Sequence, residues 1–161
     1  MQDDKNELLM IENSNMSSMI EDGFFGNIPH AKALGIEFVS ALPYRASMKL
    51  PYRDELIGNP VTGTLHGGVL ISLMDSVGGM TVFCSLSEMV SIATLDLRLD
   101  YMKPALVGQD IIAEGECYKK TNSIAFIRAI AYQGSSENLV ASCVATFMLS
   151  SNSKNQNKGV K

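Results

Sequence analysis

The residues best suited to chemistry lie in the segment His66-Gly67-Gly68 and in the apolar stretch that follows it. The stretch has the length and composition of a helix that begins at the two glycines. The first N–H groups of a helix have no partners within it, and they lie at the positive end of the helix dipole. Gly67 and Gly68 therefore predict a site for an anion or a polarised carbonyl oxygen. The alternative is a flexible helix start, or a place where helix and sheet pack closely.

Asp75 lies in the middle of this predicted helix. Its neighbours are almost all apolar: Val69, Leu70, Ile71, Leu73, Met74, Val77 and Met80. An ionised carboxylate among such residues is costly unless something requires it. A structural carboxylate satisfied by Ser72 or Ser76 is one reading, and a catalytic carboxylate is the one that we favour.

His66 and Asp75 are nine residues apart. On one straight helix this spacing puts them on opposite sides and ~13 Å apart along the axis, so they cannot form a catalytic pair. If both belong to one site, the chain bends between them or the aspartate comes from a second copy of the chain, and we expect the second copy. Small residues form a stripe beside Asp75 along which a helix or a thin substrate can approach: Gly68, Ser72, Ser76 and Gly79. A bulkier stripe is expected to lie on a sheet: Leu70, Leu73, Met74, Val77 and Thr81.

The elements that must position these residues follow from apolar periodicity. We expect a short helix from Pro29 that ends at Gly35, two strands over 36–42 and 45–50, a loop over 51–65, and four strands after the long helix. Those four strands cover 91–101, 110–118, 123–132 and 139–149. The first of them alternates, with Leu95, Leu97 and Leu99 predicted on one face and Thr94, Asp96, Arg98 and Asp100 on the other. This order predicts an α+β domain in which an antiparallel sheet wraps around the central helix.

The chain as a whole restricts the function classes. Its 161 residues suffice for one domain, and a net charge of −4 argues against a nucleic-acid partner. The three cysteines are widely spaced in apolar runs, which favours reduced core thiols in a cytoplasmic protein over a disulfide or zinc framework. We expect no metal, no cofactor, no signal peptide and no membrane span. Residues 1–27 are expected to be an extension with a short helix, and 150–161 a disordered tail.

A family resemblance follows from the motif Gly-Thr-Leu-His-Gly-Gly, with an aspartate after six further residues and a later strand that ends Asp-Tyr-Met-Lys-Pro. Over residues 28–149 the chain resembles the hotdog-fold thioesterase superfamily, and within it the acyl-CoA thioesterases of the phenylacetate-pathway type. The resemblance implies a single hotdog domain that hydrolyses an acyl-CoA to free acid and CoA. It also implies a homodimer with active sites at its interface, and often a tetramer formed from two such dimers.

The resemblance assigns roles to individual residues. The Gly67 N–H would polarise the thioester carbonyl, and Asp75 of the neighbouring chain would act as nucleophile or as general base. Asn59 and Thr94 would hold the water or the carboxylate, although Asn59 lies one residue further upstream than in some relatives. Without the resemblance, Asn59 is an ordinary turn residue and Thr94 an ordinary strand residue. His66 is expected to orient the loop or Asn59 rather than to take a proton.

Substrate contacts are also implied at Gly68 and at the lysines Lys103, Lys119 and Lys120, which could bind the CoA phosphates. In the family's CoA-binding loop a glycine often precedes the Ser or Thr, and this chain lacks it, so the lysines can equally be solvated surface charges. Two other functions compete with the thioesterase. A dehydratase or hydratase of the same fold needs a histidine that faces a carboxylate, which the placement of His66 disfavours. A non-catalytic acyl-CoA binding module is the second alternative.

Overall fold

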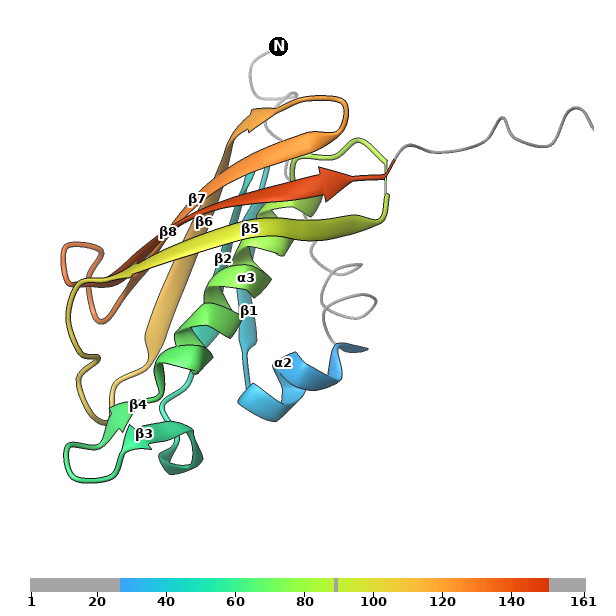
Figure 1. Cartoon of the computed structure of the whole chain (residues 1–161). Coiled ribbons are helices and arrows are strands. Elements are labelled where there is room, and N and C mark those ends of the chain that lie inside the picture. Colours follow the sequence, from blue (N-terminus) through green and yellow to red (C-terminus); the bar gives the residue numbers. More distant parts are fainter. Residues whose placement is uncertain (1–26, 89, 151–161) are drawn as a thin grey trace, which may run out of the picture.

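The computed structural model of the chain describes residues 27–88 and 90–150 (Figure 1). One six-stranded antiparallel sheet, in the order β1-β2-β6-β7-β8-β5, curves around the long helix α3 (Gly67–Phe83). Its strands are β1 (Glu37–Leu42), β2 (Arg45–Leu50), β5 (Ile92–Tyr101), β6 (Ile111–Lys120), β7 (Ile124–Tyr132) and β8 (Leu139–Leu149). The predicted hotdog domain is confirmed. The expected helix in the N-terminal extension lies outside the described residues, as does the tail beyond Ser150.

The helix α3 forms the centre of the core. Leu73, Met74 and Val77 are fully buried against the sheet, as the bulky stripe predicted. The helix approaches β6 so closely that a Cβ on Gly115 would lie 2.3 Å from the Thr81 Oγ1 atom. No helix within 27–88 or 90–150 has both the length and the apolar character needed to cross a membrane.

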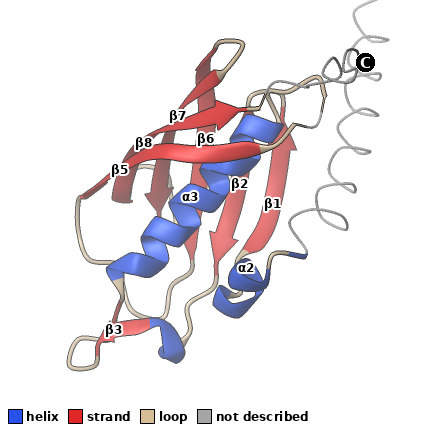
Figure 2. Cartoon of the chain, turned by 45° about the vertical axis from the view of Figure 1, so that its right-hand side comes forward, coloured by secondary structure: helices blue, strands red, loops and turns tan. Residues whose placement is uncertain are grey.

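The short helix α2 (Pro29–Leu34) lies beside α3 (Figure 2). Pro29 starts it and Gly35 ends it in the left-handed conformation, with φ of 70°, as the sequence predicted. The Arg53 guanidinium donates a hydrogen bond of 2.7 Å to the Ala33 carbonyl and so holds the last turn of α2.

The stretch 51–65 is not wholly irregular, which corrects the expectation of a loop. It contains a 3-10 turn (Asp54–Leu56) and two very short strands, β3 (Ile57–Asn59) and β4 (Thr64–Leu65), which pair with one another. Strands of three and two residues are too short to show alternation, so the sequence pattern could not reveal them.

The strict alternation predicted for 91–101 is also wrong, because β5 carries a β-bulge. Thr94 pairs with Phe147 and Asp96 with Thr146, so Leu95 is an extra residue, and it is 54% exposed. A bulge of one residue exchanges the two faces of the strand beyond it. Thr94 therefore lies on the α3 side together with Leu97, instead of on the opposite face.

The three cysteines, Cys84, Cys117 and Cys143, are free and buried, as predicted for core thiols. Burial raises the pKa of Cys84 and of Cys143 to about 11. Both therefore remain protonated at neutral pH and are poor nucleophiles.

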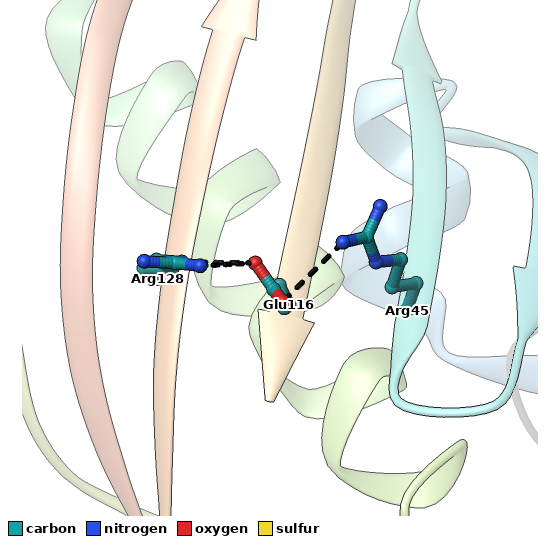
Figure 3. A network of polar contacts seen from close by, with 3 residues as sticks. All are labelled: Arg45, Glu116 and Arg128. Carbon is teal, nitrogen blue, oxygen red and sulfur yellow. Dashed lines mark hydrogen bonds and ion pairs between the residues drawn. The ribbon is translucent and has the colours of Figure 1, made fainter. Parts of the chain in front are cut away.

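Three strands are joined on the sheet face turned away from α3 by a network centred on Glu116 of β6 (Figure 3). Arg128 of β7 lies 2.7 Å from its carboxylate and Arg45 of β2 lies 3.3 Å from it. The hydrogen bond from Arg128, with the charges of both arginines, holds the pKa of Glu116 below its ordinary value.

We predict that Glu116→Gln lowers the free energy of unfolding at pH 7 and that the difference from the wild type vanishes in acid. A depressed folded-state pKa stabilises the fold above the ordinary value of 4.5 and loses this effect as the pH falls through the folded-state pKa. Urea unfolding at pH 7 and at acid pH measures the difference. Glu137→Gln, in the exposed turn before β8, is the control and should show little effect at either pH. An equal loss at both pH values for Glu116→Gln would contradict the prediction.

Candidate active site

The first turn of α3 presents one unused backbone donor. His66 is the N-cap, and its Nδ1 atom accepts a hydrogen bond of 3.0 Å from the Gly68 N–H. The Val69 N–H donates to the His66 carbonyl at 3.0 Å. Across residues 27–88 and 90–150, the Gly67 N–H has no hydrogen-bond partner. Gly67 is therefore the available donor at the positive end of the dipole, whereas the Gly68 N–H is occupied.

The role of the His66 ring follows from this contact. Because Nδ1 accepts a hydrogen bond, the proton of the neutral imidazole is on Nε2. The ring therefore caps the start of α3.

The segment before the helix is held by backbone contact. The His66 N–H donates to the Leu56 carbonyl at 2.9 Å. A Cβ on Gly58 would lie 2.6 Å from the His66 Cα atom, so only glycine fits there. The sequence reasoning did not single out Gly58, since nothing in the pattern shows that β3 crosses the helix start.

Gly67 is in turn contacted by Tyr101, the last residue of β5. The Tyr101 hydroxyl donates to the Gly67 carbonyl at 2.9 Å. A Cβ on Gly67 would lie 2.9 Å from the hydroxyl oxygen and 3.2 Å from the ring carbon that bears it. Residue 67 therefore has to be glycine while Tyr101 occupies this position.

Asp75 is held by Thr94, which the bulge in β5 has brought to the α3 side. The Thr94 hydroxyl donates a hydrogen bond of 2.8 Å to Asp75 Oδ1. Within the described residues, the carboxylate accepts no other hydrogen bond. The pair lines a cavity of about 420 Å³ between α2, α3, β5 and β8. Most of its other lining residues are apolar: Ile28, Ala31, Ile71, Met80, Phe83, Ile92, Leu97 and Phe147.

His30 of α2 lines the same cavity, although the sequence reasoning assigned it no role. Its Nε2 atom lies 3.0 Å from the Ser72 hydroxyl, which donates to the Gly68 carbonyl at 3.1 Å. The position of α2 against α3 depends on tertiary packing, so no local signal could have placed His30 here.

Asn59 lies apart from Asp75 within one chain. Its side-chain oxygen accepts from the Val61 N–H at 3.0 Å, and its carbonyl accepts from the Gly63 N–H at 2.8 Å. It thus shapes the turn between β3 and β4, is exposed, and does not line the cavity beside Asp75.

The three candidate lysines differ in their availability. The Lys103 ammonium donates to the Asn138 side chain. The Lys120 ammonium donates to the Ser85 carbonyl and lies 5.9 Å from the centre of the Tyr44 ring. Lys119 is exposed, and its ammonium has no partner in the part of the chain that the structure describes.

The chain matches the family model of the Thioesterase superfamily over residues 62–140. The Escherichia coli protein named medium/long-chain acyl-CoA thioesterase YigI is 26% identical over 144 residues, which cover 81% of this chain and 92% of that protein. Other curated relatives, which include mammalian proteins named acyl-coenzyme A thioesterase 13, are 28–30% identical, and the chain spans only 61–63% of their length.

Solved structures share the architecture. A Pseudomonas aeruginosa protein is 37% identical with a TM-score of 0.71, over 78% of this chain and 93% of that one. The PaaI protein from the phenylacetic acid degradation operon of E. coli has a TM-score of 0.75, over 86% of this chain and 96% of that one. Its identity is 17%, so this second likeness concerns the fold alone.

We predict that His66→Ala lowers the free energy of unfolding by about 1 kcal/mol, because it removes the N-cap acceptor for the Gly68 N–H. His66→Asn should keep most of the stability, since asparagine is among the best N-cap residues. Urea unfolding of both variants measures the difference. Equal stability of the alanine and asparagine variants would show that the cap contributes nothing.

Proposed function

Because the chain belongs to the thioesterase superfamily, we propose that it hydrolyses the thioester of a fatty or aryl acyl-CoA to free acid and CoA. The observation that carries the proposal is the Asp75–Thr94 pair in a mainly apolar cavity. Its volume falls within the range of small-molecule sites, and its apolar walls suit an acyl group. The similarity to YigI, which is named for medium and long acyl chains, supports this substrate class.

The mechanism uses two groups of the protein. The thioester carbonyl oxygen accepts a hydrogen bond from the Gly67 N–H, which stabilises the negative charge that develops there. One such donor typically contributes about 3 kcal/mol to lowering the barrier. Asp75 takes a proton from a water molecule while the water oxygen attacks the carbonyl carbon. The C–S bond then breaks, and the CoA thiolate leaves and takes the proton from Asp75, which returns to the carboxylate form.

We propose that each site combines Gly67 of one chain with Asp75 of another. The two residues are eight positions apart on α3, or about 12 Å along its axis. A water activated by Asp75 must come within about 3.5 Å of the carbonyl carbon, so one thioester cannot use both residues of the same helix. In the shared site, Asn59 would help to place the water near the Asp75 carboxylate of the other chain.

The edge strand β5 is the surface through which two copies would pair. Among the described residues, no strand pairs with one side of this ten-residue strand. It carries both signs of charge, with Arg98 3.1 Å from Asp100, so an antiparallel copy would meet complementary charges. We propose a homodimer with one continuous sheet, and a tetramer of two such dimers.

Lys119 is the strongest candidate for a contact with the CoA phosphates, because no residue within 27–88 or 90–150 occupies its ammonium. Lys103 and Lys120 would first have to leave Asn138 and Ser85. Gly68 would contribute to substrate binding through the close approach that its missing side chain permits. The buried free thiols favour a reducing compartment, and we propose the cytoplasm.

We predict that the wild type releases thiol from part of a panel of acyl-CoAs of short, medium and long chain length and with aryl groups. Asp75→Asn should lower kcat by two decades or more, because the amide cannot take the proton from water. A coupled thiol assay measures both, and the panel profile identifies the acyl group.

Glu137→Gln, a surface change of the same kind, should retain full activity and controls for the loss of one charge. If a folded wild type bound acyl-CoA without turning over any panel member, the enzyme proposal would fail and a binding module would remain.

We further predict that Asp75→Asn and Gly67→Ala complement each other. Asp75→Asn alone should retain no more than ~1% of the activity. Gly67→Ala keeps the N–H, but its Cβ would lie 2.9 Å from the Tyr101 hydroxyl oxygen and would disturb the direction of the donor, so we expect a loss of roughly tenfold or more. A hybrid dimer contains one site with an intact Gly67 and an intact Asp75, so unfolding and refolding the mixture should restore activity. Each variant refolded alone is the control. No recovery in a mixture that contains hybrid dimers would show that the site is not shared.

A further inference from the structure

The peptide that joins Gly67 and Gly68 is held at both of its polar ends. Its carbonyl accepts a hydrogen bond from the Tyr101 hydroxyl at 2.9 Å, and its N–H donates to His66 Nδ1 at 3.0 Å. The residue before it is also held, because the His66 N–H donates to the Leu56 carbonyl at 2.9 Å. The Gly67 N–H lies between these contacts and is the donor that none of them uses.

We propose that Tyr101 is a positioning residue, which fixes the direction of the Gly67 N–H for the thioester carbonyl. This inference rests on the proposed function. Glycine has the greatest backbone freedom of any residue, and two consecutive glycines at a helix start would leave the donor poorly directed. Donors stabilise a developing oxyanion most when they are fixed before the reaction. The N–H of Gly67 belongs to the His66–Gly67 peptide, whose carbonyl accepts from the Val69 N–H at 3.0 Å. The Tyr101 hydroxyl holds the following peptide, so Gly67 is constrained on both sides of its Cα atom.

The bulge at Leu95 explains how one strand serves both catalytic groups of its chain, which the proposed dimer assigns to two different sites. Residues 94 and 101 differ by an odd number, so in a regular strand they would point to opposite faces. The extra residue puts Thr94 and Tyr101 on the same face, toward α3, which β5 crosses in Figure 1. One strand therefore orients the Asp75 carboxylate near its beginning and the Gly67 peptide at its end.

Tyr101→Phe tests the proposal, since it removes only the hydroxyl from a residue that is 53% exposed. We expect kcat to fall roughly tenfold with KM nearly unchanged, a smaller loss than the hundredfold or more that follows removal of an oxyanion donor. Tyr52→Phe is the matched control. Its hydroxyl also donates to a backbone carbonyl, that of Gly63 at 2.9 Å, but in the turn between β3 and β4. Thermal unfolding of both variants verifies that they are folded.

A vibrational measurement separates positioning from general loosening of the fold. The probe is hexanoyl-CoA labelled with ¹³C at the thioester carbonyl and bound to Asp75→Asn, which retains Gly67. Hydrogen bonding by Gly67 lowers the C=O stretching frequency. Adding Tyr101→Phe should shift the band back toward that of free hexanoyl-CoA, whereas adding Tyr52→Phe should not.

Equal kcat values for Tyr101→Phe and Tyr52→Phe, together with an unshifted band, would overturn the role of Tyr101 and leave the thioesterase intact. A wild type without thioesterase activity would instead overturn the proposed function, and the carbonyl band would still report on Tyr101. A double-mutant cycle provides a third test, which asks whether the losses in kcat are additive. Because a Cβ on Gly67 would already displace the Tyr101 hydroxyl, Gly67→Ala with Tyr101→Phe should cost less in kcat than the sum of the single changes. Additive losses in kcat would count against the proposal that Tyr101 positions the Gly67 N–H.

Discussion

The burial of α3 in the concave face of the sheet is the constraint from which the rest of the structure follows. A helix with this many apolar residues is stable only when protein covers most of its surface. Leu73, Met74 and Val77 are fully buried, and at Gly115 there is no room for a Cβ between β6 and Thr81 of the helix. The side of the helix left over is the stripe of small residues with Asp75. The chemistry is therefore confined to the surface that packing does not occupy.

The two faces of the sheet carry different kinds of polar contact. On the outer face, Glu116 and its two arginines connect neighbouring strands at the surface, where ion pairs are screened and each contributes modestly. On the inner side, the hydrogen bond from Thr94 to Asp75 lies at the edge of an apolar cavity.

Much of the architecture was predictable from the sequence, because periodicity reports on which residues are buried. The central helix, the six main strands and α2 lie where the patterns placed them, within about two residues at their ends. The helix start at His66 was recognisable because two glycines follow it, and Asp75 because it is a carboxylate among apolar neighbours. Alternation put Thr94 on the wrong face, because it cannot reveal a single inserted residue, and only the family resemblance pointed to this threonine. The contact of Tyr101 with Gly67 was not predicted, because it depends on tertiary packing. Gly58 and His30 acquire their neighbours only through tertiary packing, and single-sequence reasoning has no access to such contacts.

The contact between Gly58 and His66 has a consequence for how this protein can change over time. With no room between the two backbones, position 58 accepts no side chain unless β3 moves away from the helix start. Neither Gly58 nor His66 lines the cavity beside Asp75, whose wall consists mostly of side chains, from His30 on α2 to Met80 and Phe83 toward the end of α3. Variation can therefore accumulate in the wall that would touch the acyl group without disturbing the carbonyl-binding end. A fold divided in this way can acquire new substrates while it keeps one reaction.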